Sequence, residues 1–130
     1  MSAGSWGLQK FRMTDPGIRT KAQAIAAILD RLIETEELAA GLREEILAAI
    51  VEREELGSTG IGHGVAVPHA KCAGISRLCG AVAEFPAGVD FESLDRKPVR
   101  LVYLIVSPQG QPAEHLRVLE AVAQHVRRKA

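Results

Sequence analysis

The sequence predicts a single α/β domain with helices on both faces of a β-sheet. Two helical patterns come first, two short apolar segments typical of buried strands follow, and a third helical pattern comes last. This order favours a layered arrangement. At 130 residues the chain is long enough to bury one self-sufficient core.

The first half of the chain is expected to be mainly helical. Residues 1–14 are weakly patterned and are expected to form a tail or a short strand around residues 8–13, ahead of a domain over residues 15–130. Thr20 and Gln23 have the spacing of a capping box, and apolar residues at helical spacing follow. We therefore expect a helix over about residues 21–35.

A second helical pattern runs from Leu42 to Arg53, and Gly57 is a typical residue just beyond a helix end. The sequence therefore predicts that this helix stops shortly before a glycine-rich segment.

The second half of the chain contains the predicted strands. Residues 78–85 and 99–106 are short, apolar and bounded by Pro, Gly or Asp, as expected of central strands buried on both faces. Residues 86–90 between them have the composition of a turn. The last helix is expected to begin near Pro112, because proline is favoured at the first helical position, and to continue through Val126.

Composition and charge exclude several functional classes. The 16 basic and 16 acidic residues cancel, and aromatic residues make up 4% of the chain, so nucleic acid is not an expected partner. The longest apolar run, residues 101–106, is too short to cross a membrane, and the first residues lack a secretory pattern. We expect a cytoplasmic protein without direct membrane insertion, in which Cys72 and Cys79 are reduced and structural.

The segment from Gly60 to Ala70, GIGHGVAVPHA, places two histidines in glycine-rich backbone. It follows a helix rather than a strand and lacks the Gly-Lys-Ser/Thr of a Walker loop, which excludes the usual nucleotide-binding loops. Pro68 fixes the backbone next to His69. The segment is therefore expected to be a stiff turn that presents a histidine.

Phosphoryl transfer is the chemistry that these residues suit best. A neutral imidazole is nucleophilic at physiological pH, and the anionic transition state needs nearby positive charge and N–H donors. Arg53 precedes the segment, and Thr59 can donate a hydrogen bond. His115 lies in the predicted first turn of the last helix, where both an anion and a neutral imidazole are favoured. Gly62 and His63 are further candidates to line the site or contact phosphate.

Two motifs resemble one known family. Residues 53–70, REELGSTGIGHGVAVPHA, and residues 114–119, EHLRVL, are similar to the signatures of type 2 enzyme IIA domains of the bacterial phosphotransferase system. This is the fructose and mannitol class together with its nitrogen-regulatory relatives. The resemblance implies a three-layer α/β/α sandwich around a mixed sheet.

The resemblance also implies a role for each site residue. His69 would accept a phosphoryl group from an HPr-type phosphocarrier protein and pass it to a downstream enzyme IIB or regulatory target, as a phosphotransferase component without a cofactor. His115 would orient His69 and steady the phosphoryl group, and Arg53 would supply charge. Family members usually continue beyond the second histidine's helix, so a homodimer is one way to cover a sheet face left open.

Two alternatives stay open. The chain could be a degenerate regulatory domain that is not phosphorylated, although both histidines and Arg53 are present. His63, His69, His115 and Cys72 could also supply metal ligands, but their spacing matches no usual site, and no metal is expected. His125 is expected to be a structural or surface residue.

Overall fold

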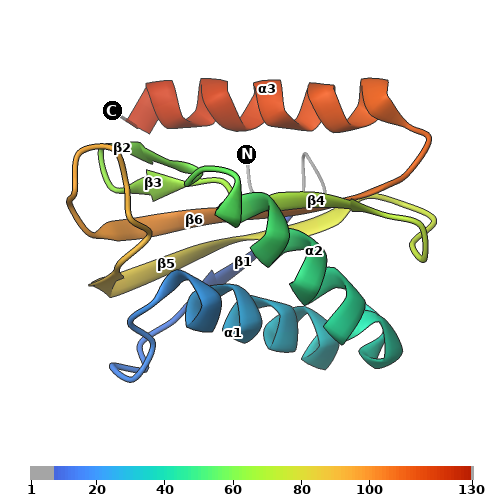
Figure 1. Ribbon diagram of the computed structural model, residues 1–130, viewed down its shortest axis with the longest axis horizontal. Coiled ribbons are helices and arrows are strands. Elements are labelled where there is room, and N and C mark those ends of the chain that lie inside the picture. The colour runs from blue at the N-terminus through green and yellow to red at the C-terminus, as the bar shows by residue number, and fades with distance from the viewer. Residues whose placement is uncertain (1–7, 130) are drawn as a thin grey trace.

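Two antiparallel strands, β5 (Cys79–Val89) and β6 (Val99–Pro108), form the centre of a six-stranded mixed sheet in the computed structural model, which describes residues 8–129 (Figure 1). The remaining elements, in chain order, are β1 (Gln9–Arg12), α1 (Lys21–Glu34), the short 3-10 helix η2 (Ala40–Leu42), α2 (Arg43–Glu55), β2 (Gly60–Gly62), β3 (Val65–Ala66), β4 (His69–Cys72) and α3 (Pro112–Lys129).

The central strands are buried on both faces, as predicted. Along β6, Val102 and Leu104 contribute to the core cluster on one face, whereas Tyr103 and Ile105 contribute to the cluster on the other. This alternation follows from the two-residue period of a strand. A sheet covered on both sides needs apolar residues at consecutive positions, which explains the continuous apolar run in the sequence.

The prediction of a turn at residues 86–90 is wrong. The structure keeps residues 86–89 within β5, and the pairing register with β6 shifts between Glu84 and Val89. Gly88 has a φ of 85°, a conformation that glycine adopts without a steric cost. This irregularity in the strand accommodates Pro86 and Gly88, whose residue types are typical of a turn.

The first helix and the first strand lie where the sequence predicts them. Thr20 accepts a hydrogen bond from the backbone of Gln23 at 3.2 Å, and the Gln23 side chain accepts one from the Thr20 backbone at 3.1 Å, which completes the capping box. β1 pairs in parallel with β5, so the strand expected around residues 8–13 belongs to the sheet. Residues 1–7, the beginning of the tail or strand expected over residues 1–14, lie outside the described residues.

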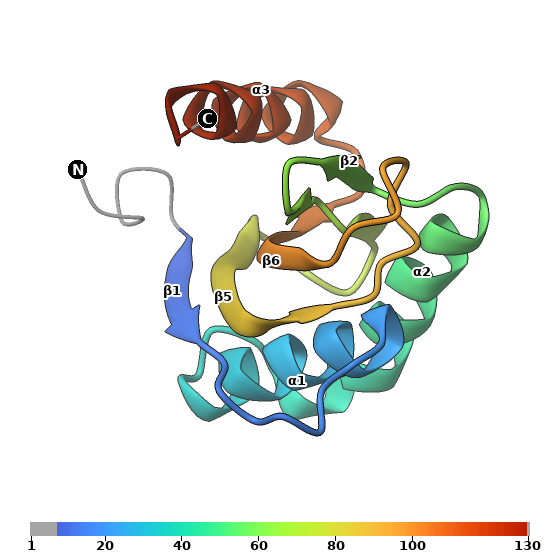
Figure 2. The same cartoon turned by 90° about the vertical axis from the view of Figure 1, so that its left-hand side faces the viewer.

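The helices form two layers (Figures 1 and 2). α1 and α2 cover one face of the sheet, and α3 crosses the opposite face. Buried residues of α1, such as Ile25 and Ile28, belong to the larger core cluster, while Val118 and Val122 of α3 belong to the smaller one. The predicted three-layer α/β/α sandwich is confirmed. Among the described residues, no helix is both long and apolar enough to cross a membrane.

The glycine-rich segment differs from the expected turn, because it forms three short strands. β2 and β3 make an antiparallel hairpin, whose tip contains His63 at a φ of 58°. β3 and β4 then both run parallel to β6 in one continuous register, Val65 opposite Leu101 and His69 opposite Ile105. β3 and β4 are therefore one strand interrupted at residues 67 and 68.

Candidate active site

The interruption between β3 and β4 orients His69. The Val67 N–H donates to the Thr59 carbonyl at 3.2 Å, and the buried Pro68 has no N–H to donate. The Val67 carbonyl lies 2.8 Å from Nδ1 of His69. A carbonyl oxygen can only accept, so in the neutral ring Nδ1 carries the proton and Nε2 carries the free lone pair.

His115, which lies in α3, is close to His69. Pro112 begins α3, as predicted, and His115 follows in the first turn with 8% of its surface exposed. The ring centroids of His69 and His115 are 5.5 Å apart, and the planes are inclined by 50°. The two histidines that are 46 positions apart in the sequence (69 to 115) therefore meet at one edge of the sheet.

Burial favours the neutral form of His115. Desolvation is the main cause that lowers the pKa of His115 from its ordinary value of 6.5, and the charges of His69 and Lys71 lower it further. A neutral His115 has one N–H to donate and one nitrogen to accept with. Its ring can therefore contact an anionic group without carrying a full charge of its own.

An open depression of about 590 Å³ contains both histidines and two cationic side chains. Arg53, in the last turn of α2, lines it and donates to the Gly57 carbonyl at 2.9 Å. Lys71 lines it from β4. Two cationic side chains beside an imidazole suit the binding of a phosphoryl group. The full set of lining residues is Ala49, Glu52, Arg53, Leu56, His69, Ala70, Lys71, His115 and Leu119.

Thr59 is not directed into this depression. The buried Thr59 donates through both its backbone N–H and its hydroxyl to the carboxylate of Glu54, which is 2% exposed. Lys21 lies 3.8 Å from the same carboxylate. Thr59 therefore fixes the connection between α2 and β2, which in turn positions Arg53 relative to His69.

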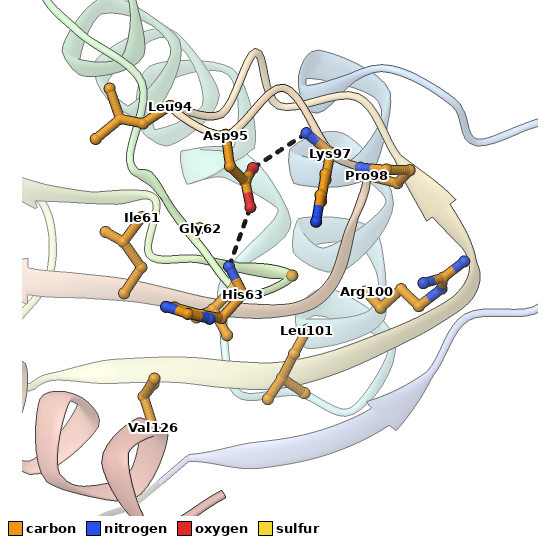
Figure 3. Close-up of a pocket in the computed structure, with 12 residues that line it drawn as sticks. Ile61, Gly62, His63, Leu94, Asp95, Lys97, Pro98, Arg100, Leu101 and Val126 are labelled. Atoms are coloured by element: carbon orange, nitrogen blue, oxygen red, sulfur yellow. Dashed lines mark hydrogen bonds between the residues drawn. The ribbon is translucent and has the colours of Figure 1, made fainter. Parts of the chain in front are cut away.

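Gly62 and His63 line a second depression, which Figure 3 shows. The backbone N–H of His63 donates to one oxygen of the Asp95 carboxylate at 3.3 Å, and the backbone N–H of Lys97 donates to the other oxygen at 3.0 Å (Figure 3). The structure thus brings together His69, His115 and Arg53, and it places Gly62 and His63 elsewhere.

Two residues near the histidines were not among the sequence candidates. Lys71 lies two positions after His69, and a strand period of two places both side chains on the same face of β4. The spacing of two residues from His69 could therefore have identified Lys71 from the sequence. Ser107 lies 2.5 Å from Nδ1 of His115 through its hydroxyl oxygen. Its only sequence signal is a polar residue at the end of an apolar strand.

His125 does not line the depression that holds His69 and His115. The Tyr103 hydroxyl forms a hydrogen bond with His125, which agrees with a structural role for that histidine.

In the described part of the chain, no group of three or more His, Cys, Asp or Glu residues is arranged to hold a metal ion. Cys72 and Cys79 are both free and buried, and burial raises the pKa of Cys79 to about 11.

Comparison with known proteins identifies the family. The family model for the phosphoenolpyruvate-dependent sugar phosphotransferase system, EIIA 2, matches residues 10–130. A nitrogen regulatory protein of Bradyrhizobium diazoefficiens is 34% identical over 110 residues, which are 85% of this chain and 70% of the relative. The fructose-specific EIIA component of Haloferax volcanii is 34% identical over 105 residues, covering 81% of this chain and 67% of the relative.

The fold agrees with this sequence similarity. The crystal structure of nitrogen regulatory protein IIA-Ntr from Neisseria meningitidis superimposes with a TM-score of 0.75 at 29% identity, covering 92% of this chain and 77% of that one. The match of the family model spans almost the entire described chain, including both histidine motifs. The chain therefore belongs to the EIIA type 2 family of the phosphoenolpyruvate-dependent sugar phosphotransferase system.

Proposed function

We propose that this chain is a phosphohistidine carrier, which accepts a phosphoryl group on Nε2 of His69 from an HPr-type phosphocarrier and passes it to an enzyme IIB or a regulatory target. The observation that carries the proposal is the pairing of His69 with His115 at 5.5 Å within an open depression. An open site suits transfer between two proteins, because the donor's phosphoryl group must reach His69 directly. We propose that this exchange takes place in the cytoplasm.

The proton on Nδ1 of His69 determines which nitrogen reacts. Because Nδ1 faces the Val67 carbonyl, the lone pair on Nε2 attacks the phosphorus, and the bond from phosphorus to the donor's nitrogen breaks. The donor keeps that electron pair. The phosphorylated His69 ring then carries a positive charge, which the Val67 carbonyl stabilises through the hydrogen bond from Nδ1. Return of the group reverses each change.

The surrounding residues stabilise the charge on the phosphoryl oxygens. Arg53 and Lys71 supply positive charge from α2 and β4, and neutral His115 supplies an N–H. Phosphoryl transfer passes through a loose transition state, so such positioned charges and donors account for most of the catalysis. Loss of the His115 side chain should therefore slow transfer by about 10²-fold to 10³-fold without preventing phosphorylation.

The test is phosphorylation by the upstream components. Incubation with phosphoenolpyruvate, enzyme I and HPr should add one acid-labile phosphate to the wild type and none to His69→Ala, as measured by intact-protein mass spectrometry. His63→Asn is the matched control, because His63 lines the other depression and asparagine tolerates its positive φ. It should be labelled like the wild type. Equal labelling of His69→Ala would refute the assignment, and an unlabelled wild type would favour the regulatory alternative.

A further inference from the structure

The hydroxyl of Ser107 is buried against His115. Ser107 lies near the end of β6, is 1% exposed, and places Oγ 2.5 Å from Nδ1 of His115. This serine takes no part in the phosphoryl transfer described above. It nevertheless contacts the ring that faces the acceptor histidine.

The direction of this hydrogen bond follows from the proton on the hydroxyl. If Nδ1 of His115 were the donor, the buried Ser107 proton would need a second acceptor, and the described residues offer it no other hydrogen bond. An unpaired buried donor costs about 1–3 kcal/mol. If Ser107 donates to Nδ1, the hydroxyl proton and the Nδ1 lone pair satisfy each other, and the single proton of the neutral ring lies on Nε2.

The two histidines of the site then have opposite tautomers. Nδ1 of His69 faces a carbonyl and carries its proton, so Nε2 is the nucleophile. Nδ1 of His115 accepts from a hydroxyl, so Nε2 is the donor. This combination gives one ring a lone pair on Nε2 that can attack phosphorus and the other ring an N–H on Nε2 that can bind a phosphoryl oxygen.

We propose that Ser107 is a positioning residue, whose hydroxyl holds His115 in the Nε2–H tautomer and thereby provides the N–H that binds the phosphoryl group in transit. This inference rests on the proposed carrier function. Without the hydroxyl, the ring of His115 can take either tautomer and can rotate, so a part of the population no longer presents the N–H.

Ring nitrogen NMR tests the tautomer directly and does not depend on phosphoryl transfer. Two-bond ¹H–¹⁵N correlation spectra distinguish a protonated nitrogen from one with a lone pair. The unphosphorylated wild type should show protonated Nε2 for His115 and protonated Nδ1 for His69. In Ser107→Ala the His115 nitrogens should move toward the averaged shifts of a ring that exchanges between tautomers, while those of His69 stay unchanged.

Transfer kinetics provide the second measurement. Ser107→Ala should lower the limiting rate of phosphoryl transfer from HPr about tenfold, less than the loss expected for His115→Ala, because a part of the population keeps the correct tautomer. The HPr concentration that gives half of the limiting rate should not change. Ser107→Thr keeps the hydroxyl, so it should keep the wild-type tautomer of His115 and most of the wild-type transfer rate.

Ser93→Ala is the matched control, because Ser93 is a buried serine whose hydroxyl has no hydrogen-bond partner among the described residues. It should transfer at the wild-type rate. Protonated Nδ1 on His115 in the wild type would overturn the proposal, even if Ser107→Ala failed to fold. An unchanged tautomer and rate in a folded Ser107→Ala would overturn it too. An unlabelled wild type would instead refute the carrier function, and the NMR result would still decide the tautomer.

Discussion

The two faces of the sheet are built differently. The face under α1 and α2 carries the larger core cluster, which includes Ile28, Leu29 and Ile50, each fully buried. The face under α3 carries the smaller cluster, to which the helix contributes buried Val118 and Val122. Polar contacts supplement it, because histidines near both ends of α3 form hydrogen bonds with Ser107 and Tyr103 of β6.

The two faces should contribute unequally to the stability of the domain. Apolar burial contributes most of the stabilising free energy of a domain, so the α1 and α2 face should dominate the stability of this fold. The site lies at the edge of the sheet, where α2 supplies Arg53 and α3 supplies His115. A helix held by few apolar contacts can open locally at a lower free energy than the whole domain. His115 therefore belongs to the layer that we expect to open at the lower free energy.

The largest effect is expected from a substitution that creates a cavity under α1. Leu29→Ala removes a side chain that is fully buried in the larger cluster, and it should lower the free energy of unfolding by about 2–5 kcal/mol. Urea denaturation followed by circular dichroism measures the change. Amide protection should fall throughout the domain, because the loss is global. A cost below that of a substitution under α3 would break the comparison.

A smaller and more local effect is expected under α3. Val122→Ala removes a side chain that is 2% exposed in the smaller cluster, and it should cost about 1–2 kcal/mol. Hydrogen exchange should show faster opening of α3, while β5 and β6 keep their protection. Uniform loss of protection across the sheet and all helices would show that both faces unfold as one unit.

The smallest effect concerns pH. Because burial lowers the pKa of His115 below 6.5, the folded state binds this proton less readily than the unfolded state. The stability that neutral His115 allows is fully present above its unfolded pKa, and it declines as pH falls from that value through the lower folded pKa. Urea denaturation between about pH 8 and about pH 5 should show this decline, and His115→Gln should reduce it. Equal slopes in both proteins would contradict this assignment.

Local signals in the sequence predicted much of the fold. The capping box at Thr20 and the proline at position 112 mark helix starts through neighbouring residues alone, and both helices begin where these signals place them. The apolar segments of β5 and β6 similarly identified central strands. Each of these signals is contained within one turn or one strand, so no distant contact is needed to interpret it.

The rest depended on contacts that the sequence does not show. β2, β3 and β4 are too short to have a strand pattern, and β3 and β4 exist because β6 supplies their hydrogen-bonding partner. For the site, the motifs indicated His69, His115 and Arg53, which the structure brings together. The separation of His63 from His69 required the hairpin, since both lie in one glycine-rich stretch of sequence.

The interruption at residues 67 and 68 has an evolutionary consequence. The acceptor for His69 is the main-chain oxygen of Val67, and every amino acid supplies that atom, so position 67 can vary in side chain as long as the backbone stays extended. The acceptor and donor roles at His115 instead depend on one side-chain hydroxyl. A single nucleotide change can remove it. The orientation of His69 should therefore tolerate substitution of its hydrogen-bonding partner better than the tautomer of His115 does.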